Sequence, residues 1–277
     1  MWYNGGKMSL SLQFLGTGTS VGVPQIGCTC PTCTSTDPRD RRRRTGAYVR
    51  TGKVSFLIDT PPEMRIAALE LGITKVDAIV ITHCHMDHVA GFDDVRRFNT
   101  LNGSPGPDGK IVGAPMRCFA APETIESMHR IFPYVSDRAN EQGLFRPMIR
   151  FTSVEGEFRI GDATLVPLPV EHGPRTNGYL IQCGGTRFAY ISDCAAIPDE
   201  TLGLMDGIDV LVLDCLRKRR HPTHLDLEKA LGYVERIGPR RTWFVHMCHD
   251  VKHAEFEAEL PENVRLAYDG LKIEDGK

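Results

Sequence analysis

Residues 82–88 read Thr-His-Cys-His-Met-Asp-His, directly after the apolar run VDAIVI, which predicts a buried strand. His83 and His85 are two positions apart, so in an extended chain both side chains point the same way. Asp87 and His88 then lie on the turn into a predicted helix. Imidazole and carboxylate ligands together suit Zn, Mn or Fe. This stretch therefore predicts a metal site where the chain leaves a sheet.

Further ligand-type side chains follow other apolar strands. His172 comes after TLVPLPV, Asp193 after FAYIS and His246 after TWFV, while Asp59 ends the strand SFLID. Taken one at a time, such residues are more often structural than metal-binding. Their shared position just beyond a strand is what makes them candidates for the same site.

The HxHxDH pattern, followed in this order by the three later residues, resembles the metallo-β-lactamase superfamily. The resemblance implies an α/β fold, an αββα sandwich of two mixed β-sheets with helices on the outer faces. It also implies two divalent ions at the active site, Mn or Zn. The expected ligands of one ion are His83, His85 and His172. Those of the other are Asp87, His88 and His246, with Asp193 bridging the two ions. Asp59 is expected behind the ligands, orienting one of them, and Asp87 is expected to be catalytic as well.

A second cluster lies in residues 28–33, which read CTCPTC. A tetrahedral zinc site needs one more ligand than these three cysteines, and His249 is the best candidate because it lies three residues after His246. Cys248 is a rival fourth ligand, and a reduced thiol cluster without metal is a further alternative. The chain has nine cysteines, and a tight cluster among them points to a metal rather than to disulfides. The six scattered ones are expected to be buried small hydrophobes.

This cysteine loop, together with HxHxDH, resembles the PhnP-like branch of the superfamily, the phosphoribosyl 1,2-cyclic phosphate phosphodiesterases. In that branch Cys28, Cys30, Cys33 and His249 would hold a structural zinc. The resemblance implies a metal-dependent phosphodiesterase that hydrolyses a small cyclic phosphate or nucleotide-type phosphodiester with a hydroxide activated by two metals.

The segment HPTH at 221–224 resembles one in this branch whose second histidine reaches the active site. His224 is therefore expected to be catalytic and to bind substrate, as a proton donor or phosphate ligand. Asp214, after the strand VLVLD, is expected to brace this loop.

Two alternatives stay open: an endonuclease that processes the 3′ end of transfer RNA, and a non-catalytic, zinc-stabilised nucleotide-binding module. The transfer-RNA nuclease family lacks the cysteine loop, and we see no long Gly/Pro-rich arm that would grip RNA. RNA is thus the less favoured partner. The basic runs 39–44 and 217–220 are either solvated loop faces or attract phosphate. The resemblance favours a homodimer.

The chain has 277 residues, with 33 Lys+Arg and 35 Asp+Glu, a balance that argues against a wholly basic nucleic-acid binder. Its apolar runs are far shorter than the roughly 18 residues of a membrane span, and its first ten residues lack a signal-peptide pattern. We expect a cytoplasmic protein without membrane partners. Residues 1–277 are expected to form a single hydrolase domain with a flexible extension at 1–8.

Strands and helices interleave along the sequence without a linker. Strands are predicted at 10–15, 48–50, 54–58, 76–82, 149–154, 158–160, 164–170, 179–182, 187–191, 210–213 and 242–245. Helices are predicted at 62–71, 88–99, 123–131, 199–205 and 225–237, and a loop at 102–109.

Overall fold

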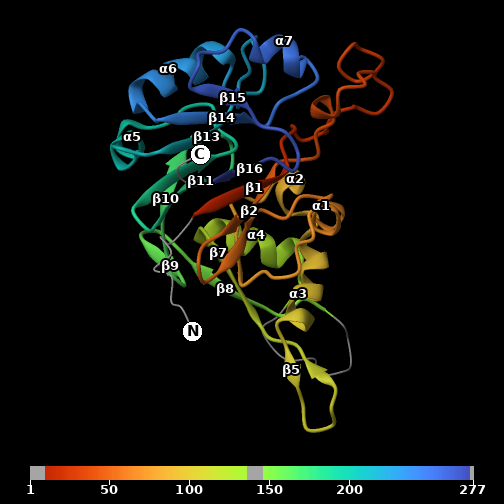
Figure 1. The fold of residues 1–277 in the computed structure, drawn as a ribbon. Helices are drawn as coiled ribbons and strands as arrows, with labels where there is room; N and C mark the ends of the chain where they lie inside the picture. Colours follow the sequence, from red (N-terminus) through yellow and green to blue (C-terminus); the bar gives the residue numbers. More distant parts are fainter. Residues whose placement is uncertain (1–9, 136–145, 275–277) are drawn as a thin grey trace, which may run out of the picture.

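The computed structural model describes residues 10–135 and 146–274, so the extension expected at 1–8 lies outside the described part. Its framework is two seven-stranded sheets (Figure 1). The first has the order β16-β1-β2-β3-β4-β7-β8. Its strands are β1 (Ser11–Gly16), β2 (Gly46–Arg50), β3 (Ser55–Ile58), β4 (Ala78–Val80), β7 (Met116–Ala120), β8 (Ile149–Ser153) and β16 (Lys272–Glu274).

The second sheet has the order β15-β14-β13-β12-β11-β10-β9. Its strands are β9 (Phe158–Ile160), β10 (Ala163–Val170), β11 (Thr176–Cys183), β12 (Thr186–Ile191), β13 (Val210–Asp214), β14 (Arg241–Val245) and β15 (Val264–Leu266). Both sheets are mixed. Strands β3, β4, β7 and β8 run parallel in the first, as do β12, β13, β14 and β15 in the second.

Helices cover the outer face of each sheet (Figure 1). The first sheet carries α1 (Met64–Glu70), α2 (Met86–Val89), α3 (Arg96–Leu101) and α4 (Pro122–Ile131). The second carries α5 (Asp199–Leu204), α6 (Leu227–Ile237) and α7 (His253–Glu257). The expected αββα sandwich is therefore confirmed.

Three apolar layers hold the sandwich together, and β13 shows why its strand sequence is continuously apolar. Val210 and Val212 belong to the cluster between the two sheets, whereas Leu211 and Leu213 pack with the helices outside. Successive side chains of a strand point to opposite faces, so a strand covered on both faces buries every residue.

The helix predicted at 88–99 is interrupted. Helix α2 ends at Val89, a 3-10 turn covers Phe92–Val95, and α3 begins at Arg96. The cause is a close approach at Gly91, where a Cβ atom would lie 2.2 Å from the carbonyl oxygen of Pro61. At this point the Gly91 amide donates to the Thr60 carbonyl at 2.9 Å, so the loop before α1 accepts the hydrogen bond that would otherwise continue the helix.

The stretch predicted as a loop at 102–109 instead opens a short hairpin. Strands β5 (Ser104–Pro105) and β6 (Ile111–Val112) form a sheet of their own, and the hairpin projects beyond α3 (Figure 1). We call residues 104–112 the arm. The patterns also missed β7, α7, β15 and β16. Within the described ranges, no helix is long and apolar enough to cross a membrane.

Candidate metal centre

The ligand-type residues predicted from the sequence meet at one edge of the sandwich. Asp59 follows β3 and His83 follows β4, while Asp193 follows β12 and His246 follows β14. All four strands belong to the parallel portions of the two sheets. The carboxyl ends of parallel strands open onto the same edge, which is where α/β proteins place their sites.

Three histidines form the first group. The Nε2 atom of His83 lies 2.9 Å from Nδ1 of His85, and Nε2 of His172 lies 3.2 Å from that same Nδ1. The other ring nitrogens are held from behind: Nδ1 of His83 lies 3.0 Å from the Thr82 hydroxyl, and Nδ1 of His172 donates to the Thr223 carbonyl at 2.8 Å. These outer contacts leave three ring nitrogens directed at one point.

Asp87, His88 and His246 form the second group, in which each residue offers an atom within 4.8 Å of the others. The Asp193 carboxylate lies between the two groups. One of its oxygens is 3.2 Å from Nε2 of His88, and the other is 3.1 Å from Nε2 of His246 and 3.8 Å from Nε2 of His172. The position of Asp193 is therefore that of a bridge.

Several buried atoms of this centre make no regular hydrogen bond within the described residues, and this tests whether metal ions fit there. Nε2 of His88, Nε2 of His246 and one oxygen of Asp193 are buried, and although the rings lie within 3.1–3.2 Å of the carboxylate, none of these three atoms makes a hydrogen bond of acceptable geometry. Buried polar atoms normally find a partner, and imidazole with carboxylate is a donor set suited to Zn or Mn. The residues fit divalent cations.

The pKa shifts of His83 and Asp193 favour the forms that bind a metal. For His88, burial opposes the charged form, but Asp193 and Asp59 outweigh it and hold the pKa of that imidazole well above its usual range. Burial lowers the pKa of His83 well below its usual range. Burial opposes ionisation of Asp193, but His246 and His88 outweigh it and hold the pKa of that carboxyl well below its usual range. A neutral imidazole and an ionised carboxylate are the forms that bind a metal.

Asp59 contacts the ring nitrogen of His88 that does not face Asp87 and Asp193. Its carboxylate is fully buried, accepts from the backbone and hydroxyl of Thr82 at 2.8 Å each, and lies 2.7 Å from Nδ1 of His88. The backbone is also unusual here: Asp59 has φ of 62° and His246 has φ of 61°. Left-handed conformations of non-glycine residues are costly and concentrate at functional sites.

His224 and Asp214 stand beside the two groups. Nδ1 of His224 lies 2.9 Å from the Asp214 carboxylate, which also accepts from the backbone of Cys194 and Leu225. The other side of the ring approaches the centre, since His224 shares a cluster of atoms within 4.8 Å with His172 and Asp193. Burial lowers the pKa of His224, but Asp214 more than compensates and raises it.

The cysteine cluster is assembled as the sequence predicts. Nδ1 of His249 lies 3.2 Å from the sulfur of Cys28, 3.5 Å from that of Cys30 and 3.7 Å from that of Cys33. The Cys33 amide donates to the Cys30 sulfur, which lowers the pKa of Cys30 to about 6. Three thiols and one imidazole match a structural zinc site.

The remaining cysteines lie elsewhere. The Cys248 sulfur accepts from the backbone of Asp250 and is not part of the four-residue group. Five of the six scattered cysteines are buried, as predicted. Cys84, between two of the ligand histidines, is partly exposed, so that prediction was wrong for it.

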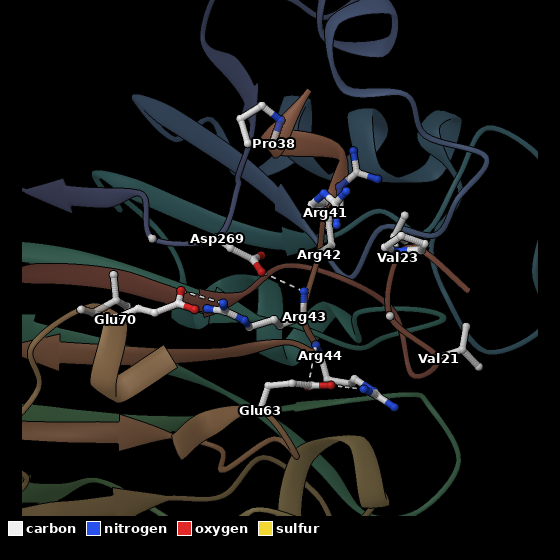
Figure 2. Close-up of a pocket in the computed structure, with 14 residues that line it drawn as sticks. Val21, Val23, Pro38, Arg41, Arg42, Arg43, Arg44, Glu63, Glu70 and Asp269 are labelled. Atoms are coloured by element: carbon white, nitrogen blue, oxygen red, sulfur yellow. Dashed lines mark hydrogen bonds and ion pairs between the residues drawn. The ribbon is translucent and has the colours of Figure 1, made fainter. Parts of the chain in front are cut away.

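Four arginines of the basic run at 39–44, Arg41 to Arg44, line a cavity of about 410 Å³, and three of them form ion pairs (Figure 2). Arg42 is buried and lies 3.4 Å from Asp40, Arg43 pairs with Glu70 at 2.6 Å, and Arg44 pairs with Glu63. The run at 217–220 is similar, with Lys218 on Glu259 and Arg219 on Asp250. Their packing is that of structural loops.

Two functional contacts escaped the sequence patterns. The Thr82 hydroxyl links Asp59 to His83, and the Thr223 carbonyl holds His172. Thr82 directly precedes the histidine motif, but nothing local reveals its partner Asp59, because that partner lies on a different strand.

Comparison with known proteins identifies the family to which this chain belongs. Residues 55–247 match the model of the beta-lactamase superfamily domain. A solved structure described as a new diphosphatase from the PhnP family is 37% identical, with a TM-score of 0.84 over 96% of this chain and 97% of that one.

Two relatives bear other names. An octanoyltransferase of Porphyromonas gingivalis is 32% identical over 265 residues, which are 93% of this chain but 50% of that protein. The chain thus spans about half the length of this relative. Coenzyme PQQ synthesis protein B of Methylobacterium nodulans is 26% identical over 234 residues, 72% of this chain and 71% of that protein.

Proposed function

The chain belongs to the beta-lactamase superfamily and to its PhnP-like branch, and from this premise we propose that it is a metal-dependent phosphodiesterase acting on a small cyclic phosphate or nucleotide-type phosphodiester. The observation that carries the proposal is the converging set of buried histidines and carboxylates, with buried atoms that make no regular hydrogen bond aimed at shared points and His224 beside them. Its substrates are free in solution and none is a membrane lipid.

In the proposed site, His83, His85 and His172 would hold one divalent ion, and Asp87, His88 and His246 would hold the other, with the Asp193 carboxylate between the two groups. When bound, such ions lower the pKa of a coordinated water and neutralise phosphoryl charge. We assign the ions as Mn or Zn and give the cysteine cluster a structural Zn.

The chain's own contribution is orientation and proton transfer. Asp59 accepts from Nδ1 of His88, so Nε2 faces the centre. Asp214 accepts from Nδ1 of His224 and, against the effect of burial, raises the pKa of this histidine, which favours the imidazolium form with a second proton on Nε2 at the edge of the site. We assign this proton to the departing alkoxide oxygen of the substrate, a step that contributes roughly 100- to 10,000-fold in enzymes.

Leaving-group dependence tests the role of His224. A p-nitrophenolate departs without a proton, whereas an alkoxide needs one. His224→Gln should therefore reduce hydrolysis of an alkyl phosphodiester by at least about 100-fold while changing that of a p-nitrophenyl phosphodiester much less. Equal losses on both substrates would contradict an acid role and leave His224 as a structural or phosphate-binding residue.

The substrate class is tested with a panel followed by ³¹P NMR: 5-phosphoribosyl 1,2-cyclic phosphate, a nucleotide with a bridging diphosphate, and a 3′-extended transfer RNA. The diphosphate is included because the similar solved structure is described as a diphosphatase. We expect fastest turnover of the cyclic phosphate. Faster cleavage of the diphosphate would shift the proposal to anhydrides, and cleavage of RNA alone would favour the processing nuclease.

A further inference from the structure

The arm stands apart from the two large sheets. Its two strands pair with each other in a separate two-stranded sheet, and it projects away from the sandwich (Figure 1). Ile111 and Val112, the residues of β6, are each 51% exposed. A two-stranded hairpin alone in water is marginally stable at best, and packing against another surface is what stabilises it. The exposed pair of β-branched residues indicates that a further surface covers the arm.

A matching apolar groove lies at the foot of the arm, between α1 and α3. It encloses about 640 Å³, and buried Met64 and Phe98 are among the residues that line it. Leu69, 67% exposed, and Leu101, 43% exposed, stand at its edge. Large apolar side chains left open around a groove are typical of an interaction site.

We propose that the arm of a second copy of this chain lies in the α1–α3 groove, and that two copies exchange their arms reciprocally in a twofold symmetric dimer. The topology favours this arrangement because α3 forms one wall of the groove and ends at Leu101, and only two residues separate it from the start of β5 at Ser104. Groove and arm are thus neighbours on one surface, as a self-complementary twofold interface requires.

The length and the charge of the arm are consistent with its binding in the groove of a second copy. From its base to its turn the arm extends roughly 15 Å at about 3.3 Å per residue, enough to lie along a helix of two turns. Asp108 and Lys110 pair with each other at 3.2 Å, so the arm carries no net charge into the groove. An RNA-gripping arm would instead need an excess of cations. The groove is lined by Asp94 as well as by Arg65 and Arg97. Both members of the pair of Asp108 and Lys110 of an incoming arm therefore have a residue of opposite charge in the lining.

Sedimentation analysis of the full chain over a range of concentrations tests the dimer. We expect a monomer–dimer equilibrium whose dissociation constant rises at least about tenfold in Ile111→Asp, in the arm, and in Leu69→Asp, in the groove. The matched control is Leu204→Asp: Leu204 is 42% exposed on α5, over the other sheet, and its change should leave the dimer intact. Unchanged far-UV circular dichroism would verify folding in each variant.

Mixing the two variants provides the sharper test. In an exchanged dimer, the Ile111→Asp chain still has an intact groove and the Leu69→Asp chain an intact arm, so one contact of the two survives in a heterodimer. We expect the mixture to form dimers at concentrations where each variant alone is monomeric. A wild-type chain that stays monomeric, a dimer insensitive to either change, no recovery on mixing, or RNA binding by the arm of a monomer would overturn the proposal.

Discussion

At the scale of single residues, the centre depends on carboxylates that cannot be replaced by their amides. Asp193 faces His88 with one oxygen and His246 with the other. An amide nitrogen is a donor and cannot bind a cation. Asp59 does not face the metal position itself; it contacts Nδ1 of His88 and so fixes the orientation of that imidazole ring.

Substitutions of Asp193 and Asp59 should distinguish the role of a metal ligand from that of a residue that orients a ligand. Asp59→Asn should weaken metal affinity by about 10- to 100-fold, as is usual for an outer partner of a metal-binding histidine, and Asp193→Asn should weaken it more. Asp199→Asn is the matched control, because its side chain is 89% exposed on α5. Isothermal titration of the metal-free proteins with Mn²⁺ measures this, and equal affinities in all four proteins would refute the ligand assignment.

Asp269, which belongs to none of the candidate metal groups described above, should give the free energy of unfolding a specific pH dependence. Burial raises the pKa of Asp269 from 3.8 to about 6, although the backbone of Arg43 and the hydroxyl of Thr17 donate to it. A folded pKa above the unfolded one means that stability is fully present below pH 3.8 and is lost as the pH rises through 6.

Asp269→Asn removes this titration. Relative to wild type, the variant should therefore gain about 2 kcal/mol in free energy of unfolding between pH 4 and pH 7, whatever its offset at pH 4. Urea unfolding with a chelator present measures this difference. A difference that stays constant across that range would show that Asp269 is ionised at pH 4 in the folded protein.

At the scale of elements, the segment after β14 connects the two clusters. His246 points to the centre and His249 to the cysteines, while Met247 between them pairs through its backbone with Thr17 and Thr19. Arg42 donates to the Cys248 carbonyl at 3.4 Å. Because His246 holds a strained φ of 61°, these contacts on both sides are what keep it in place.

Loss of the cysteine site should therefore affect the centre. Cys33→Ser is expected to release the structural zinc, lower the melting temperature and weaken Mn²⁺ binding at the centre, since structural zinc contributes directly to folding. Cys248→Ser is the control and should retain zinc. Zinc content, melting temperature and Mn²⁺ affinity are measured together. A Cys33→Ser protein with full stability and full Mn²⁺ affinity would disprove the connection.

At the scale of the whole molecule, the strands with continuous apolar sequence were predictable, because burial on both faces removes every polar residue. Strand β13 is an example. Strand β7 (Met116–Ala120) was missed since exposed Arg117 interrupts its apolar pattern, and the short β16 has exposed Lys272 and partly exposed Glu274. The local sequence pattern does not predict strands such as these, because they are stabilised by hydrogen bonds to neighbouring strands rather than by a continuous apolar sequence.

The site was predictable in a different way. The histidine motif predicts a metal site by itself, but the grouping of His172, Asp193 and His246 with it came from the family resemblance. Spacing along the chain carries no information about which strand ends meet. For the same reason the contacts of Thr82 with Asp59 and of Thr223 with His172 emerged only from the fold.

The most direct test of the account is a titration of the zinc-loaded but otherwise metal-free protein with Mn²⁺, following hydrolysis of 5-phosphoribosyl 1,2-cyclic phosphate. We expect turnover to reach its maximum when a second equivalent of Mn²⁺ has bound, and we expect Asp87→Ala, which removes a proposed ligand of one ion, to abolish it. Full turnover with one equivalent or none, or undiminished turnover in Asp87→Ala, would contradict a reaction carried out by two ions held by these residues.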